Sequence, residues 1–251
     1  MKKYIFIIIA LISVSNLMAI PNDSLIYRAN KEYSEGLYND AIENYLKVID
    51  NGYESSELYY NIGNSYFKIN DMASAILYFE KAKKISPNDE DIIFNLNVAN
   101  SKIADKIETV PELFYVRWWN TFYNLFSVDT WAKITIFIFI LTLIFASIFF
   151  LSSTKNLKKF SFWFGIILLL LTIFTFGLSS QKYYYSKKYN EAIVFTPTLT
   201  VKSSPNKNSV DLFVIHEGAK VLIIDKVDNW YEIRIANGSV GWLPYSAVKR
   251  I

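Results

Sequence analysis

The stretch from Asn61 to Ala82, NIGNSYFKINDMASAILYFEKA, decides the fold of the N-terminal half of this chain. Its apolar residues recur at the spacing of an amphipathic helix, yet Gly63 lies inside the pattern. Glycine within a helix costs about 1 kcal/mol relative to alanine. A second small residue, Ala75, follows in the next helical segment. We infer two antiparallel helices that approach closely at these two small residues, so that helix packing offsets the cost of the glycine.

The pattern recurs after about 34 residues, which is the period of tetratricopeptide repeats. The clearest unit, roughly Ser56–Asp89, carries small, aromatic and proline residues at the packing positions of this repeat. These positions are Gly63, Tyr66, Ala75, Phe79, Ala82 and Pro87. We expect the two aromatic residues to fill the space beside the close approach, and the proline to end the second helix. A weaker unit precedes it and a partial one follows, so residues 20–110 resemble an all-α solenoid of about two and a half repeats.

The first helix of each repeat lines the concave face of such a stack. Equivalent positions there carry amide and aromatic side chains, namely Asn30, Tyr33, Tyr60, Asn64 and Phe67. An amide both donates and accepts hydrogen bonds, so two asparagines one repeat apart are suited to hold the backbone of an extended peptide. The alternative is that both asparagines are only polar surface.

The N-terminus has the layout of a secretory signal peptide over residues 1–19. Lys2 and Lys3 precede an apolar run, and Ala19 marks the expected cleavage point. An uncleaved anchor is the alternative, because Leu17 stands where a small residue is usual. In either case the signal predicts that the following residues are exported.

Two further apolar runs, 131–151 and 160–179, are long enough to cross the ~30 Å hydrocarbon core of a bilayer as helices. The turn between them, 152–159, is short, which predicts an antiparallel transmembrane hairpin. Its lysines favour the cytoplasm, although lysines after the second run favour the same side. The export signal resolves this conflict and places residues 20–130 and 180–251 in the periplasm, with the hairpin in the inner membrane.

The segment 111–130, between the repeats and the first apolar run, is aromatic and amphipathic. Two interpretations are open. It caps the helical stack, or it lies in the headgroup layer of the membrane beside the first span.

The last 62 residues, 190–251, follow a short linker at 180–189 and show a different pattern. About five short alternating runs are separated by turn residues, and Asn237-Gly238 indicates a hairpin. The run NWYEIRIANGSVGWLP resembles bacterial SH3-like domains, which implies a small all-β barrel. We expect Tyr231, Trp242 and Tyr245 to form its ligand surface. The alternative places Trp230 and Trp242 in the core and rim of the barrel.

Composition excludes several classes of function. The chain has no cysteine and one histidine, so we expect no catalytic residues, no metal site and no cofactor. Residues 20–110 hold fifteen acidic and nine basic residues, which argues against nucleic acid as a partner. The basic residues elsewhere flank the apolar runs, where lipid headgroups are the expected contact.

The order of export signal, repeats, hairpin and barrel resembles the E-type (BatE-like) proteins of the Bacteroides aerotolerance (Bat) operon. The resemblance rests on Gly63 to Pro87, on Phe94–Leu96, on the hairpin and on EGAKVLIIDKVDNWYEIRIANGSVGWLP. It implies a non-catalytic envelope scaffold, related to aerotolerance and stress, that works with membrane proteins carrying von Willebrand A (VWA) domains and with a MoxR-type ATPase. The alternative function is an envelope sensor whose SH3-like domain binds peptidoglycan or peptide.

Overall fold

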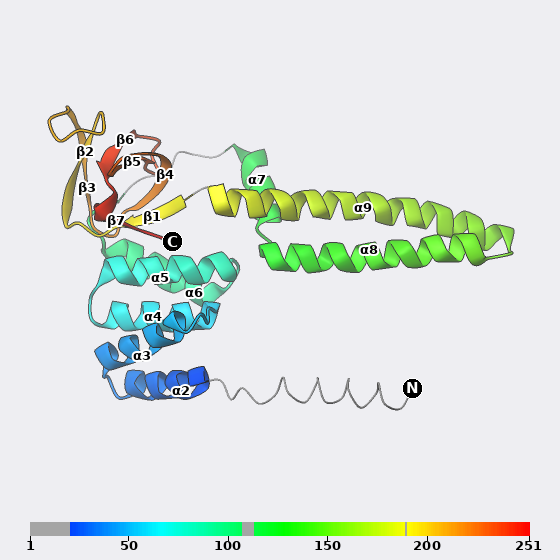
Figure 1. Cartoon of the computed structure of the whole chain (residues 1–251), viewed down its shortest axis with the longest axis horizontal. Coiled ribbons are helices and arrows are strands. Elements are labelled where there is room, and N and C mark those ends of the chain that lie inside the picture. The colour runs from blue at the N-terminus through cyan, green and yellow to red at the C-terminus, as the bar shows by residue number, and fades with distance from the viewer. Residues whose placement is uncertain (1–20, 107–112, 189) are drawn as a thin grey trace.

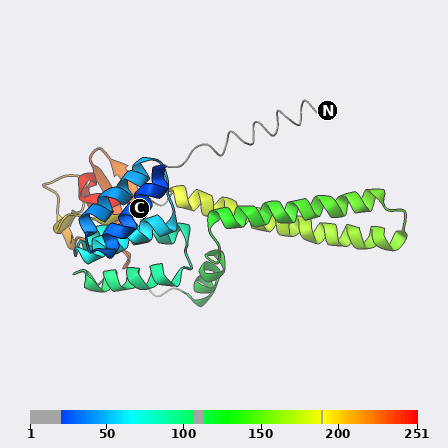
Figure 2. The same cartoon turned by 90° about the horizontal axis from the view of Figure 1, so that it is seen from below.

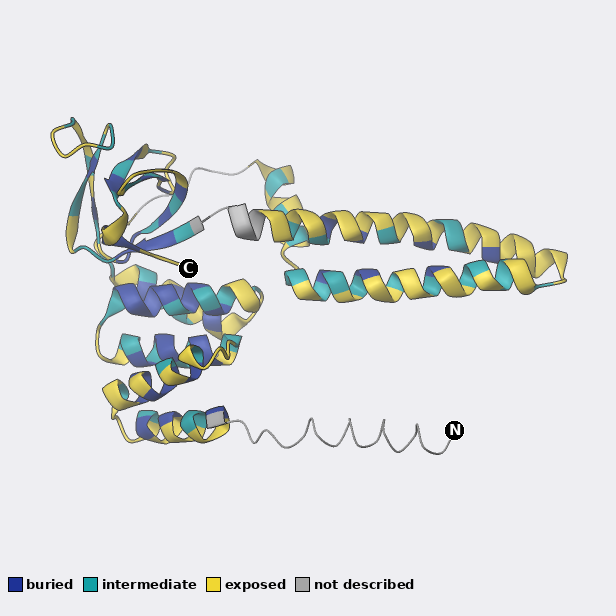
Figure 3. Cartoon of the chain, in the orientation of Figure 1, coloured by how far each residue is buried: buried dark blue, intermediate teal, exposed yellow. Residues whose placement is uncertain are grey.

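A computed structural model describes residues 21–106, 113–188 and 190–251 of the chain. A helical stack, a long helical hairpin and a β-barrel follow one another along the chain (Figure 1). Buried residues concentrate in the stack and the barrel, whereas most of the hairpin surface is exposed (Figure 3). The predicted signal peptide at residues 1–19 lies outside the described residues.

The stack consists of five helices in two antiparallel pairs and a single last helix. Their bounds are α2 (Pro21–Ser34), α3 (Tyr38–Asp50), α4 (Ser56–Lys68), α5 (Met72–Ile85) and α6 (Glu90–Lys102). Three of them begin at a side-chain cap: Ser55 accepts from the backbone of Leu58, Asp71 from Ser74, and Asp89 from Ile92. Helix α5 ends two residues before Pro87, as the sequence predicts.

The hairpin consists of α8 (Val128–Leu151) and α9 (Lys155–Lys188), preceded by the short α7 (Phe114–Tyr123). Both long helices are long and apolar enough to cross a membrane. The turn is shorter than expected, because residues 155–159 contain no helix breaker and join α9. For the same reason the expected linker is helical as far as Lys188, and a single residue of the sequence lies between α9 and β1.

The barrel is a seven-stranded antiparallel sheet, rather than the five or so strands expected. The strands are β1 (Asn190–Val194), β2 (Thr198–Lys202), β3 (Asp211–His216), β4 (Lys220–Val227), β5 (Trp230–Arg234), β6 (Val240–Pro244) and β7 (Val248–Arg250), with a 3-10 turn, η1 (Tyr245–Ala247), before the last. Their order in the sheet is β3-β2-β6-β5-β4-β1-β7. Strands β1 and β7, at the two ends of the domain in sequence, pair with each other. The predicted hairpin is confirmed, because β5 and β6 pair across Asn237-Gly238.

The barrel packs directly on the last helices of the stack, above α5 and α6 (Figure 1). Strand β1 makes this contact, because its side chains alternate between two cores. Ala192 and Val194 belong to the barrel core, whereas Ile193, fully buried, belongs to a cluster with Phe79 and Leu96 of the stack. In the described residues no second helix pairs with α6, and the barrel covers the end of the stack instead.

Candidate peptide-binding site

The close approach predicted at Gly63 is present, but its partner is an aromatic ring. A Cβ atom on Gly63 would lie 2.6 Å from Cδ1 of Phe79 on α5. Phe79, Ala75 and Ala82 are fully buried, so the ring cannot move into solvent. The glycine therefore makes room for the Phe79 ring, and α4 and α5 pack around it.

The other predicted packing residues lie around this contact. The ring of Tyr66 is half-buried and stacks on Tyr78, with the ring centroids 5.6 Å apart. Ala82 belongs to the cluster that joins the two repeats, together with Tyr45 and Ile92. Pro87 lies in the turn between α5 and α6.

The two predicted asparagines each accept a hydrogen bond from a neighbouring helix. Oδ1 of Asn30 accepts from the hydroxyl of Tyr45 at 2.5 Å. Burial raises the pKa of Tyr45 to about 12, so this hydroxyl stays protonated and remains a donor at neutral pH. Oδ1 of Asn64 accepts from Nδ2 of Asn95 at 2.8 Å. The structure thus fixes both amides and turns their carbonyl oxygens toward the protein.

Asn95, on α6, was not predicted as a groove residue. Its amide nitrogen donates both to Asn64 and to the hydroxyl of Tyr60, at 2.9 Å, and so ties α6 to α4. Asn95 lies 31 residues after Asn64, which is close to the repeat period, and this spacing is the signal that could have identified it.

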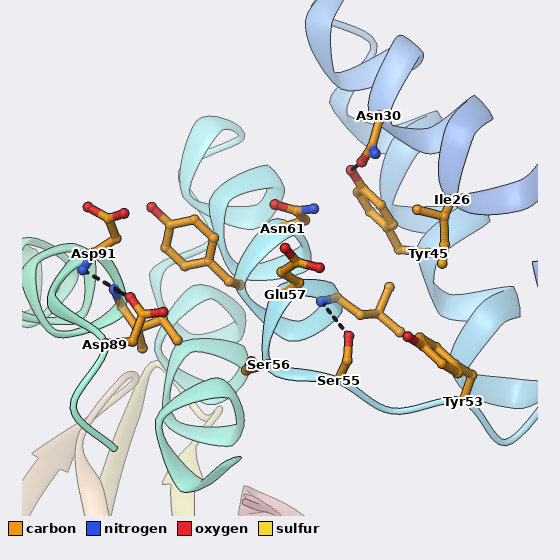
Figure 4. A pocket seen from close by; sticks show the side chains of 13 residues that line it. Ile26, Asn30, Tyr45, Tyr53, Ser55, Ser56, Glu57, Asn61, Asp89 and Asp91 are labelled. Carbon is orange, nitrogen blue, oxygen red and sulfur yellow. Dashed lines mark hydrogen bonds between the residues drawn. The ribbon is translucent and has the colours of Figure 1, made fainter. Parts of the chain in front are cut away.

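A pocket of about 410 Å³ opens on the concave face, the side of the stack that α2, α4 and α6 line as the first helices of their repeats. Figure 4 shows Asn30 and Ile26 of α2 on one side, Asn61 of α4 at the centre, and Asp91 of α6 on the other side. Tyr60 also lines this pocket. Two predicted groove residues, Asn30 and Tyr60, therefore share one cavity.

The remaining predicted groove residues lie outside that cavity. Tyr33 is half-buried and its ring meets Tyr38 edge to face, with centroids 5.4 Å apart. Phe67 lies under the ammonium group of Lys102, which is 4.4 Å from the ring centroid. Asn64 is engaged with Asn95 and does not line the pocket. Two of the five predicted residues therefore line the pocket, and Asn64 is linked to one of them, Tyr60, through Asn95.

The predicted ligand surface of the barrel requires one correction. Tyr231 is only 8% exposed, because alternation along β5 turns it inward with Ile233. Its hydroxyl accepts from the guanidinium of Arg250 at 3.0 Å. Tyr245 is 48% exposed and meets Tyr231 edge to face. Trp242 is half-buried on β6, between the inward-facing Gly241 and Leu243, and so lies on the outer face of the barrel. Trp242 and Tyr245 therefore remain as candidates for the ligand surface.

Ion pairs join the barrel to the stack, and the sequence analysis missed them. Nζ of Lys220 on β4 lies 3.0 Å from carboxylate oxygens of both Glu80 on α5 and Glu191 on β1. Burial alone lowers the pKa of Lys220, but the two carboxylates outweigh burial and raise it above its usual value. The amine therefore stays charged at neutral pH.

A second polar contact joins the chain after α6 to the end of β3. The carboxylate of Asp105 accepts the backbone N–H of His216 at 2.6 Å and lies 2.7 Å from Nδ1 of its ring. Beside it, Gly218 has a φ of +86°, and a Cβ there would lie 2.5 Å from Ile103. His216, the one histidine of the chain, is thus part of the contact between barrel and stack.

Two family models match this chain. Residues 56–89 match the tetratricopeptide repeat. Residues 197–249 match the bacterial SH3 domain. No curated protein matches the chain. The predicted fold class is confirmed: an all-α repeat solenoid and an all-β SH3-like barrel are joined by a two-helix hairpin of apolar helices.

Both kinds of module are associated with binding to protein or to peptidoglycan. In the described parts of the chain, no three His, Asp or Glu residues gather as metal ligands would. The pocket offers amide, phenol and carboxylate groups beside apolar Ile26, which can hold an extended peptide through its backbone and side chains.

Proposed function

We propose that this protein is a non-catalytic scaffold of the inner membrane, whose repeat stack and SH3-like barrel bind protein partners in the periplasm. The observation that carries the proposal is the pocket on the concave face. Equivalent helices of consecutive repeats form it, and it lies open beside a fully packed core. The pocket exposes hydrogen-bonding groups of Asn30, Asn61 and Asp91, which are available to a partner.

The contact between barrel and stack supports the scaffold role. Ile193 packs on the stack, and two polar contacts between the modules, Asp105 with His216 and Glu80 with Lys220, join residues 111 and 140 apart in sequence. The pocket of the stack and the outer face of the barrel are therefore held at a fixed separation, and a single residue of the sequence lies between helix α9 and the barrel. Partners bound at the two surfaces would be held close together, which raises their effective concentration.

The resemblance to Bat-operon proteins supplies the class of partner. We propose VWA-domain membrane proteins as the direct partners and a MoxR-type ATPase as part of the same system, in a complex related to aerotolerance. The bilayer is the third partner, through α8 and α9.

The pocket is tested by filling it. Asn61 lines the pocket and its side chain is partly exposed, so Asn61→Trp should block the cavity without removing a packing residue. We expect recovery of the VWA-domain partner with the tagged full-length chain, purified from native membranes, to fall by at least about tenfold, equivalent to 1.4 kcal/mol. Asn39→Trp, at an exposed position on α3 outside the pocket, is the matched control and should leave recovery unchanged. Equal recovery with both variants would exclude the pocket.

The membrane topology is tested separately. A fluorescent protein that matures only in the cytosol, fused after Ile251, should stay dark, because the proposal places the barrel in the periplasm. The same reporter inserted between Ser152 and Thr154, in the turn of the hairpin, should fluoresce. Fluorescence behind Ile251 would reverse the orientation and remove periplasmic proteins from the possible partners.

A further inference from the structure

We propose that helix α7 is an interfacial anchor: its aromatic face lies in the headgroup region of the bilayer leaflet next to the repeat stack. This inference rests on the proposed membrane placement of α8 and α9 and adds a second, separate contact with lipid. Of the two interpretations of segment 111–130, a cap of the stack or a helix in the headgroup layer, the inference favours the second. The reason is that the barrel, and not α7, covers the end of the stack.

The composition of α7 is that of an interfacial helix. At 100° per residue, its apolar side chains occupy a continuous arc, made by Phe114, Tyr115, Val116, Trp118, Trp119, Phe122 and Tyr123. Arg117, Asn120 and Thr121 occupy the remaining arc, and α7 contains no acidic residue. Aromatic residues on one face with a basic residue on the other are typical of helices that lie in the membrane interface.

Most of the aromatic face is not used for packing within the protein. None of the ten residues of α7 is buried. Phe114 is 83% exposed and Trp118 is 84% exposed. Exposed aromatic side chains that lie together in this way mark a surface that contacts a partner or a membrane.

The position of α7 identifies the bilayer as that partner. The helix lies across the axis of the α8–α9 hairpin in both views (Figures 1 and 2). If the hairpin crosses the membrane, α7 therefore lies along its surface. The ring of Phe122 contacts Trp131 of α8 and Phe174 of α9, with centroids 5.8 and 6.4 Å apart, which places α7 at the end of the apolar spans.

The C-terminal end of α7 is held at this level by hydrogen bonds. Nζ of Lys182 on α9 donates to the carbonyl oxygens of Tyr123 and Phe126, at 3.1 and 2.7 Å. The indole nitrogen of Trp131 donates to Tyr123 at 3.2 Å. Lysine and tryptophan at the end of a span are the residues expected at the membrane interface, and here both fix α7 to the hairpin.

Site-directed spin labelling tests the inference directly, because the chain has no cysteine and any single-cysteine variant can be labelled at one site. Full-length Trp118→Cys and Asn120→Cys, which lie about 200° apart around the helix and so on opposite faces of α7, would be labelled with a nitroxide in vesicles of phosphatidylethanolamine and phosphatidylglycerol. Collision of the label with oxygen reports lipid, and collision with a water-soluble nickel chelate reports water. Ile140→Cys, exposed on α8, is the reference for the span.

We expect the oxygen-to-nickel ratio at Trp118→Cys to be severalfold higher than at Asn120→Cys and lower than at Ile140→Cys. Lipid contact at Ile140 with water contact at Trp118 would overturn the anchor and leave the membrane placement intact. Low collision rates with both reagents at Trp118 would indicate a protein contact and would also overturn it. Water contact at both Trp118 and Ile140 would overturn the membrane placement itself.

Discussion

Ile193→Asp is expected to release the barrel from the repeat stack while the barrel stays folded. The Ile193 side chain is fully buried among stack residues, whereas its neighbours on β1 face the barrel interior. Truncating such a side chain costs about 2–5 kcal/mol, and a buried unpaired carboxylate adds to that cost until the two modules separate. Separation then exposes the aspartate to water without disturbing the barrel core.

Hydrogen exchange of the full-length protein measures this outcome. Amides of α5 and α6 should exchange faster, whereas those of β4 and β5 should keep their protection. Val214→Asp introduces the same charge on β3, where the side chain is half-exposed, and should change neither group of amides. Loss of protection throughout β4 and β5 in Ile193→Asp would contradict this account, because it would show that the barrel needs Ile193 to fold.

Gly63→Val is expected to destabilise the repeat stack by about 3 kcal/mol, at the upper end of the cost of overpacking a core. The first added carbon would lie 2.6 Å from the ring of Phe79, which is buried on every side. Exchange of the amides in residues 56–89 should accelerate on the order of 100-fold if they exchange through opening of this repeat.

Two further variants show whether the clash with Phe79 is the cause. Combining Gly63→Val with Phe79→Leu should recover part of the lost stability, because leucine leaves space at the ring position. Gly177→Ala adds a carbon to a helical glycine with no atom within 4 Å, and should be neutral or slightly stabilising. Failure of Phe79→Leu to relieve any of the loss would show that another contact is responsible.

The repeat itself was predictable because its interactions are local. Gly63, Phe79 and Pro87 lie within one repeat unit, and the residue pattern at a fixed period specifies how the two helices meet. The barrel was recognisable for a similar reason, since alternation and the Asn237-Gly238 turn mark its strands.

The candidate site was only partly predictable. The repeat period identified Asn30 and Tyr60, which share the pocket, because equivalent positions face the same side of a stack. The period did not show that the side-chain oxygens of Asn30 and Asn64 accept hydrogen bonds within the protein. Tyr45 is the donor to Asn30, and Asn95 is the donor to Asn64. Tyr231 was wrongly predicted to lie on the ligand surface. Whether a tyrosine on β5 faces the core or the solvent depends on the register of that strand, which the sequence did not give.

The sequence by itself determined the elements: periodic packing residues form the repeats, uncharged apolar runs form the hairpin, and alternating residues form the strands. Each of these signals acts between residues that are close in the chain. Only the tertiary structure decided that the barrel rests on the stack, since Lys220 and Glu80 are 140 residues apart and no local pattern records their contact. Only the tertiary structure placed α7 across the hairpin, because its direction depends on Lys182 and Trp131, which belong to other helices.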